Sequence, residues 1–395
     1  MAVKYLKDNL NKVKDKTVLL RLDLNEPISD SGKVLDDFRI VSAIPTIKLL
    51  LKEHSLVIIC AHLGRPRGKK LRHLSMVPVA ERLEELLGLK VAFYKGNIKT
   101  IKARDEIRTM PNHGIIFLEN IRFYLEEEKN NPKFARKLAS LADVYVNDAF
   151  GSIHRKEASI TGVPKYIPGF VGPLVQKEMT GLEFILQRAR KPFVTMIAGL
   201  KMTDKARALD ILAKRSDYIL LGGGIANLIY KSKGFEIGVS SFEKSAMPIA
   251  KLLYRTHTSK IILPADLVVT NKRMDKSSIK VVEPQQVGPR DRIVDIGPKT
   301  ILAFAKILKG AQTIVWNGPL GNFEVKPFDT GTMALAKVVG GVSKGRAFGL
   351  VGGGETVDSI RLAGQEKYID HLSTGGGAML AYLSGQKLAG IEALK

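Results

Sequence analysis

The chain has almost no cysteine and no long apolar run. Cys60 is the single cysteine among 395 residues, which excludes an internal disulfide framework and favours a reducing compartment. No segment has the uninterrupted apolar length of a transmembrane helix, and the first residues lack the apolar core of a signal peptide. These absences predict a cytoplasmic protein without a membrane span.

Acidic residues are also scarce relative to basic ones. The chain has 62 Lys and Arg against 39 Asp and Glu, a net charge of +23 that is spread over both halves. An even spread disfavours a dedicated nucleic-acid-binding arm. Two explanations stay open: a positive field that speeds the encounter with polyanionic ligands, or a surface charge adapted to the organism's cytoplasm or temperature.

The length exceeds what one hydrophobic core usually supports, so two domains are expected. Short apolar runs alternate with amphipathic helical patterns, which indicates parallel sheets covered on both faces. The alternation pauses at the proline- and glycine-rich segment Val163–Pro173, the favoured domain boundary and hinge. We therefore expect an α/β fold of two doubly wound parallel-sheet domains. The expected strands are Thr17–Leu22, Leu56–Cys60, Val91–Tyr94, Ile115–Leu118, Val144–Val146, Phe193–Ile197, Tyr218–Leu221, Ile261–Leu263, Thr313–Trp316 and Ala347–Val351.

Basic and polar residues recur after the apolar runs of the first half. In open α/β sheets, ligands bind beyond the carboxyl ends of the strands. One arginine there could be a solvated surface charge and one histidine a structural group, but their recurrence favours a site for a small, strongly anionic molecule, because guanidinium binds carboxylate and phosphate bidentately. The residues are Asp23, Asn25, Arg39, His62, Arg65, Arg122, Asp148, His154 and Arg155.

The second half contains three glycine runs, Gly222–Gly224, Gly352–Gly354 and Gly375–Gly377. A strand that leads through glycines into a helix can bind phosphate on the helix N-terminus, although tight strand–helix packing would require the same glycines. Lys201 and Lys205 are four residues apart near an expected helix start, so they can share one face.

These glycines and lysines, with the carboxylates that follow nearby strands, suit a nucleotide with Mg²⁺. No Walker A motif occurs and no G-x-G-x-x-G follows the first strand, so the P-loop and Rossmann interpretations lack their fingerprints. Two phosphate sites across a hinge suggest phosphoryl transfer with domain closure. A two-domain ligase or a binding protein stays open on these features alone.

Several long motifs then occur in a fixed order. They are Arg21-Leu-Asp-Leu-Asn-Glu-Pro27, His62-Leu-Gly-Arg-Pro66, Leu118-Glu-Asn-Ile-Arg-Phe123, Val146-Asn-Asp-Ala-Phe-Gly-Ser-Ile-His-Arg155, Asp295-Ile-Gly-Pro298, Trp316-Asn-Gly-Pro319 and Ser373-Thr-Gly-Gly-Gly-Ala378. With them the chain resembles the phosphoglycerate kinases from end to end. The resemblance implies a domain over 1–172 that binds phosphoglycerate, a nucleotide domain over 173–378, and a segment over 379–395 that returns to the first domain.

The resemblance further implies reversible phosphoryl transfer between 1,3-bisphosphoglycerate and ADP, with Mg²⁺, by a monomer that binds no nucleic acid. Arg39, Lys201 and Lys205 would offset charge on the transferring group. The substrate would contact Asp23, Leu24, Asn25, Arg39, His62, Leu63, Gly64, Arg65, Arg122 and Arg155. The nucleotide would contact Gly199, Lys201, Lys205, Gly223, Asn317, Pro319, Glu324, Gly352, Gly353, Gly354, Glu355 and Thr356, with Glu355 as the metal ligand.

Two residues depart from the family's usual pattern. Leu200 stands where Ala or Ser is usual, and it is expected near the adenine, where it would tighten packing or narrow nucleotide choice. Glu355 stands where Asp is usual, and Mg²⁺ tolerates little deviation from octahedral geometry. Two rival interpretations remain: a basic α/β protein that binds nucleic acid, and a family member that has lost catalysis.

Overall fold

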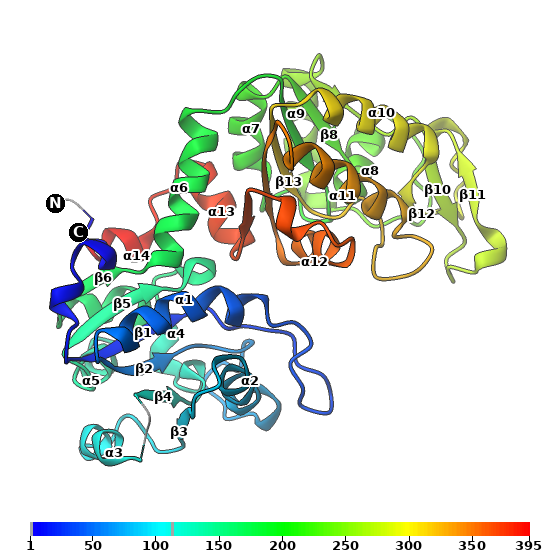
Figure 1. Ribbon diagram of the computed structural model, residues 1–395. Helices are drawn as coiled ribbons and strands as arrows, with labels where there is room; N and C mark the ends of the chain where they lie inside the picture. Colours follow the sequence, from blue (N-terminus) through cyan, green and yellow to red (C-terminus); the bar gives the residue numbers. More distant parts are fainter. Residues whose placement is uncertain (1–2, 112–113) are drawn as a thin grey trace. The chain divides into compact units, whose positions relative to one another are not determined.

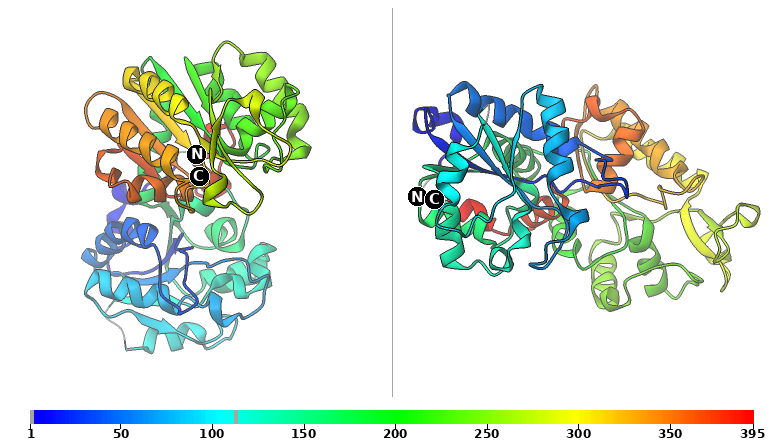
Figure 2. Two further views of the ribbon diagram at one scale, coloured as in Figure 1. Left: turned by 90° about the vertical axis from the view of Figure 1, so that its right-hand side faces the viewer. Right: turned by 90° about the horizontal axis from the view of Figure 1, so that it is seen from below.

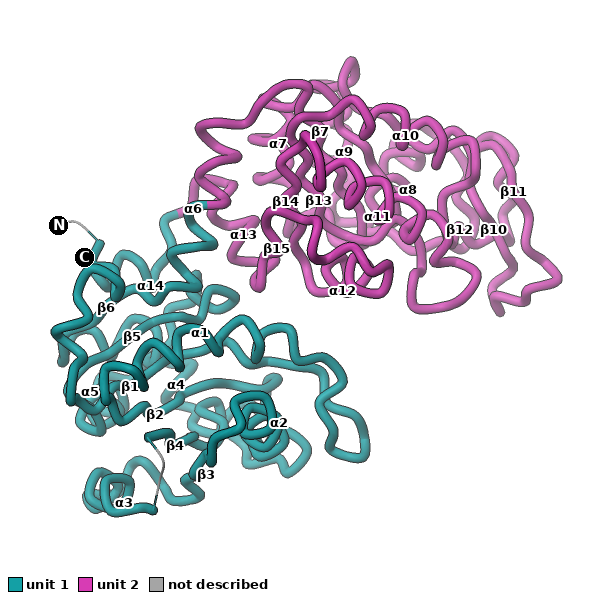
Figure 3. Tube along the Cα trace, in the orientation of Figure 1, with its two compact units in different colours: residues 1–180, 387–395 teal, residues 181–386 magenta. Residues whose placement is uncertain are grey.

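The computed structural model describes residues 3–111 and 114–395, and the chain divides into two compact units (Figure 3). The first unit holds residues 1–180 and 387–395, and the second holds 181–386. Helix α6 (Pro173–Gln187) begins in the first unit and ends in the second. Among the residues that the structure describes, no helix is both long and apolar enough to cross a membrane.

The first unit is built on a six-stranded parallel sheet with strand order β3-β4-β2-β1-β5-β6 (Figure 1). Every residue of the central strand β1 is buried, as expected for a continuous apolar run in a sheet covered on both faces. The strands are β1 (Thr17–Leu22), β2 (Leu56–Cys60), β3 (Ala92–Tyr94), β4 (Ile115–Leu118), β5 (Val144–Asp148) and β6 (Gly169–Val171).

Helices cover this sheet on both faces (Figure 2). Helices α1 (Phe38–Lys52) and α2 (Val77–Leu87) pack together, as do α4 (Leu125–Glu128) and α5 (Pro132–Ala139). Asn131 caps α5 by accepting hydrogen bonds from the backbone N–H groups of Lys133 and Phe134. The remaining helices are α3 (Ala103–Thr109) and α14 (Ala389–Glu392), and Gly390 N in α14 donates to Ile153 O at 2.8 Å.

The second unit contains a six-stranded parallel sheet with order β15-β14-β13-β7-β8-β9 and a three-stranded antiparallel sheet with order β11-β10-β12. The parallel strands are β7 (Phe193–Ile197), β8 (Tyr218–Leu221), β9 (Ile261–Ile262), β13 (Thr313–Asn317), β14 (Phe348–Gly352) and β15 (His371–Ser373). The antiparallel strands are β10 (Leu267–Thr270), β11 (Lys280–Val282) and β12 (Arg292–Ile296). The helices are α7 (Ala206–Arg215), α8 (Gly223–Ser232), α9 (Met247–His257), α10 (Pro298–Gly310), α11 (Thr330–Ser343), α12 (Gly354–Leu362) and α13 (Gly376–Leu383).

The expectation of an α/β fold with parallel sheets is confirmed, and the long apolar strands lie where the sequence predicted them. Five strands were missed. Strand β6 lies inside Val163–Pro173, which had been interpreted only as an irregular boundary. The strands β11, β12 and β15 were not anticipated, because they are short and polar or exposed residues interrupt their apolar signal. The strand β10 was also missed; it is a largely buried run of only four residues, and its antiparallel pairing is set by the tertiary structure.

Candidate active site

In the first unit, two asparagine side chains tie together the loops that follow β1, β2 and β4. Asn25 Oδ1 accepts a hydrogen bond from Gly64 N at 2.7 Å. Asn120 Nδ2 donates to Leu63 O at 2.7 Å, and Asn120 Oδ1 accepts from Arg122 N at 3.1 Å. Satisfied polar networks of this kind rigidify a fold, so these loops are held in one arrangement.

Arg39 is held beside Asn25 by a buried carboxylate. Its guanidinium donates through NH1 to Glu26 Oε2 at 2.9 Å and to Asn25 O at 3.1 Å, and its backbone N–H donates to Glu26 Oε1 at 2.7 Å. Burial raises the pKa of Glu26 to about 7, and the charge of Arg39 opposes that rise. The Arg39 side chain remains 23% exposed, so its positive charge is accessible to an anion.

Glu157 lies among three arginines. Its Oε1 is 2.6 Å from Arg122 NH2 and 3.6 Å from Arg155 NH1, and its Oε2 is 3.9 Å from Arg21 NH2. Arg122 also donates through NH1 to Gly64 O at 2.9 Å. The carboxylate therefore partly compensates a cluster of positive charge and fixes the direction of Arg122. Glu157 was not predicted from the sequence, because a lone acidic residue after a basic motif resembles a surface charge.

His62 is neutral in this environment. It is 3% exposed, and its Nδ1 lies 3.2 Å from Arg21 NH2. Because a guanidinium only donates, Nδ1 must accept, which leaves the ring proton on Nε2. Burial, followed by the charges of Arg21 and Arg122, lowers the His62 pKa well below its ordinary value. His62 therefore offers a ligand a neutral N–H donor. Burial likewise lowers the pKa of His154.

The other strand-end residues of this unit differ in their surroundings. Asp23 Oδ1 accepts from Asn25 N at 3.3 Å, and Arg65 is exposed on the loop after β2. Asp148 is fully buried, and its carboxylate accepts from Thr46 Oγ1 at 2.5 Å and from Val175 N at 3.0 Å. Asp148 therefore accepts a hydrogen bond from a backbone N–H group in the first turn of α6. Its position after a strand did not reveal this structural role.

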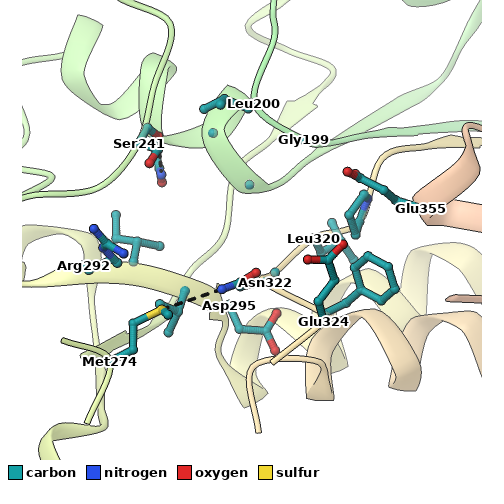
Figure 4. Close-up of a pocket in the computed structure, with 18 residues that line it drawn as sticks. Gly199, Leu200, Ser241, Met274, Arg292, Asp295, Leu320, Asn322, Glu324 and Glu355 are labelled. Atoms are coloured by element: carbon teal, nitrogen blue, oxygen red, sulfur yellow. Dashed lines mark hydrogen bonds between the residues drawn. The ribbon is translucent and has the colours of Figure 1, made fainter. Parts of the chain in front are cut away.

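The second unit contains a cavity of about 310 Å³ beyond the carboxyl ends of its parallel strands (Figure 4). Six of the residues expected to contact a nucleotide or to lie beside it line this cavity: Gly199, Leu200, Gly223, Pro319, Glu324 and Glu355. Figure 4 places Glu355 and Glu324 at one side of the cavity and Ser241, Arg292 and Met274 at the opposite side.

The glycine runs allow the loops around this cavity to approach closely. Gly223 has φ +57, and a Cβ there would lie 2.9 Å from Gly199 N. Gly353 has φ +98, and a Cβ on Gly376 would lie 2.7 Å from Gly353 Cα. The first run therefore packs on the loop after β7, and the third run packs on the second. Close backbone packing, the alternative that the sequence left open, explains these glycines in part.

Asn317 and Thr356 are buried and link the loops after β13 and β14. Asn317 Nδ2 donates to Gly352 O at 2.7 Å, and Thr356 Oγ1 accepts from Gly318 N at 2.7 Å. Their side-chain bonds hold the glycine-rich backbone at the start of α12 in place. Backbone N–H groups at such a helix start favour an anion.

The two lysines differ in their environments. Lys201 is exposed, whereas Lys205 donates through Nζ to Ala198 O at 2.5 Å. Burial lowers the pKa of Lys205 to about 8, and Glu355 opposes this shift. The expectation that they share a face of a helix start is wrong, because α7 begins at Ala206 and both lysines precede it. The loop after β7 contains Gly199 and extends to Lys205, so α7 begins later in the chain than expected.

Glu355 is exposed in the first turn of α12 and lines the cavity. Mg²⁺ is usually bound through one or two carboxylates together with substrate phosphates and water, so this donor set fits the ion. Across residues 3–111 and 114–395, no cluster of three or more His, Cys, Asp or Glu residues could hold a metal without a substrate.

The far side of the cavity was not anticipated from the sequence. It is formed by residues of α8, β12 and connecting loops, which lie outside the glycine-rich motifs. These residues are Asn227, Ser241, Met274, Arg292, Ile293, Val294, Asp295, Asn322 and Phe323. Apart from Asp295, which opens a motif noted in the sequence, no local pattern marks them, because only the fold brings them together.

A family model described as phosphoglycerate kinase matches residues 7–386. The chain is 40% identical over 397 residues to phosphoglycerate kinase of Pelotomaculum thermopropionicum, covering 100% of this chain and 99% of that protein. It is 40% identical to the cytosolic phosphoglycerate kinase 3 of Arabidopsis thaliana, covering 97% of this chain and 96% of that one. Phosphoglycerate kinase from Pyrococcus horikoshii matches with a TM-score of 0.87 and 30% identity, covering 99% of this chain and 98% of that chain.

Proposed function

The chain belongs to the phosphoglycerate kinase family, and we propose that its first unit binds phosphoglycerate and its second unit binds the nucleotide. The enzyme transfers a phosphoryl group reversibly from 1,3-bisphosphoglycerate to ADP, which gives 3-phosphoglycerate and ATP. In the transfer, a bond forms between a β-phosphate oxygen of ADP and the phosphorus, and the acyl phosphate bond breaks to leave the carboxylate of 3-phosphoglycerate.

The first unit would bind the phosphoglycerate. The observation that supports this proposal is the cluster of Arg122 and Arg155 around one carboxylate, next to the fixed loops that carry Asn25 and Gly64. Guanidinium groups pair with phosphate and carboxylate, the two charged groups of the substrate. Arg39, held by Glu26 and partly exposed, would offset charge on the transferring group.

The second unit would bind the nucleotide in the cavity of Figure 4. The start of α12 and Lys205 would meet the phosphates, and Glu324, which lines the cavity, would contact the nucleotide. Glu355 would hold Mg²⁺, which when bound supplies positive charge at the phosphate oxygens. Little covalent chemistry is required of these residues, because positioning and charge stabilisation account for most catalysis of phosphoryl transfer.

We further propose that the protein acts as a cytoplasmic monomer. Its single buried cysteine suits a reducing compartment, and relatives from Arabidopsis thaliana and Nicotiana tabacum carry cytosolic in their names. Light scattering during gel filtration would test the monomer, since a mass well above 43.4 kDa would contradict it.

Titration of 3-phosphoglycerate tests the binding assignment in the first unit. Arg65 and Arg67 are both exposed on one loop, so Arg65→Ala and Arg67→Ala are matched in burial and charge. We expect Arg65→Ala to weaken 3-phosphoglycerate binding about tenfold, within the range for loss of a hydrogen bond to a charged group. Arg67→Ala should bind normally. Equal affinities in both variants would contradict the role given to Arg65.

A further inference from the structure

Glu26 joins the start of α1 to the Arg39 side chain. Its Oε1 accepts hydrogen bonds from the backbone N–H groups of Arg39 at 2.7 Å and Ile40 at 3.3 Å, and its Oε2 accepts from Arg39 NH1 at 2.9 Å. α1 begins at Phe38, and the first-turn N–H groups of a helix need acceptors from outside it. One carboxylate oxygen therefore caps the helix, and the other holds the guanidinium.

The two partners differ in burial. The Glu26 side chain is 0% exposed, whereas the Arg39 side chain is 23% exposed. Glu26 is therefore shielded from a ligand, and Arg39 is the partner that an anion reaches. Arg39 NH1 also donates to Asn25 O at 3.1 Å, so the guanidinium is directed toward the loop after β1. The other carboxylates that act on this pair are Asp36 and Asp23.

The charge of Glu26 matters to the guanidinium more than to the helix cap. A neutral carbonyl oxygen also accepts from backbone N–H groups, whereas a charge-assisted bond to guanidinium is roughly twice as strong as a neutral one. Burial raises the pKa of Glu26 to about 7, although the charge of Arg39 opposes that rise. The carboxylate is therefore about one-tenth ionised at pH 6 and about nine-tenths ionised at pH 8.

We propose that ionised Glu26 is a positioning residue, which holds the Arg39 guanidinium in the orientation that offsets charge on the transferring phosphoryl group. Glu26 does not touch the substrate and acts through Arg39, so this inference rests on the function proposed for Arg39. Orientation of such a group is a large part of catalysis, because a misplacement of about 1 Å can cost about 10²-fold in rate.

Glu26→Gln separates the two contacts. The amide oxygen still accepts from the backbone N–H groups of α1, but an NH₂ group replaces the oxygen that faces Arg39, and both groups only donate. The measurement is kcat/KM for 3-phosphoglycerate at saturating ATP and Mg²⁺ between pH 6 and 8. The ratio of wild type to variant removes the titration of the substrate, since both proteins share it.

We expect Glu26→Gln to lose about tenfold relative to wild type with fully ionised Glu26. The ratio should therefore rise from about twofold at pH 6 to about ninefold at pH 8. In an Arg39→Ala background, Glu26→Gln should cause no further loss. Asp37→Asn, which removes a carboxylate that pairs with Arg82 at the start of α1, should match wild type at every pH.

A ratio near one throughout, or a loss that is the same at every pH, would overturn the inference, because a cap alone gives no dependence on ionisation. A further tenfold loss in the Arg39→Ala background would also overturn it. If Glu26→Gln does not fold, the ratio of wild type to Arg39→Ala decides, since it should rise about fivefold from pH 6 to 8 and a constant ratio would contradict the proposal. A wild-type protein without turnover would contradict the proposed function itself.

Discussion

Lys205 gives the proposed nucleotide site a specific pH signature. Its ammonium donates to Ala198 O, and burial lowers its pKa to about 8. At pH 8 about half of the free protein therefore carries a neutral Lys205. An opposite charge within about 4–6 Å favours the charged form of a group by about 1–3 pKa units. If the phosphates of ADP approach Lys205, the bound protein is almost fully protonated at this position.

We expect ADP binding at pH 8 to take up about half a proton, and binding near pH 6.5 to take up almost none at Lys205. Isothermal titration calorimetry in buffers of different ionisation enthalpy measures this number, because the observed enthalpy changes linearly with the buffer's ionisation enthalpy. At pH 8 the ADP phosphates are already largely ionised, so their own titration contributes little.

Two lysine variants isolate the source of the proton. Lys205→Met should abolish the uptake at pH 8, whereas Lys201→Met, which removes an exposed lysine from the same loop, should retain it. No uptake in the wild-type protein, or equal uptake in Lys205→Met, would refute the placement of Lys205 beside the phosphates.

Three further outcomes follow, two from buried carboxylates and one from the two departures from the family's usual pattern. Glu157→Ala should lower the free energy of unfolding by about 3–5 kcal/mol in urea titrations, because it leaves buried arginine charge uncompensated; a loss below about 1 kcal/mol would contradict its role. Burial raises the pKa of Glu127 from 4.5 to about 7, so the folded state binds this proton more tightly than the unfolded state does. The proton therefore stabilises the fold below pH 4.5, and this stabilisation is lost as the pH rises through 7. Glu127→Gln should therefore show a smaller fall in Tm than wild type between pH 5 and 8, and identical slopes would exclude this contribution. Leu200→Ala should change the preference between ATP and GTP, and Glu355→Asp should change the preference between Mg²⁺ and Mn²⁺. Unchanged kinetics in both variants would show that neither residue alters nucleotide or metal preference.

The parts of the fold that were predictable are those with a strong local signal. β1 and β7 are continuous apolar runs buried along their whole length, and such runs are typical of central parallel strands. β11 was not predictable, because it is a short strand with exposed residues whose pairing with β10 is set by the tertiary structure.

The same distinction applies to the candidate site. Residues after apolar runs, such as Asn25 and Arg39, could be proposed because parallel strands end at one edge of a sheet. Glu157 could not, because its significance comes from ion pairs with arginines that lie elsewhere in the sequence. Lys205 was expected near the phosphates, but its depressed pKa follows from burial, which no sequence motif encodes.

The most direct measurement is ATP formation from ADP and enzymatically generated 1,3-bisphosphoglycerate by wild-type protein and by Arg39→Ala. We predict turnover by the wild-type protein and a loss of at least about 10²-fold in kcat for Arg39→Ala, as is typical when one charge-stabilising donor is removed. Circular dichroism should show that the variant remains folded. A folded Arg39→Ala protein with near-normal kcat would contradict the role of Arg39, and a wild-type protein without turnover would contradict the kinase activity.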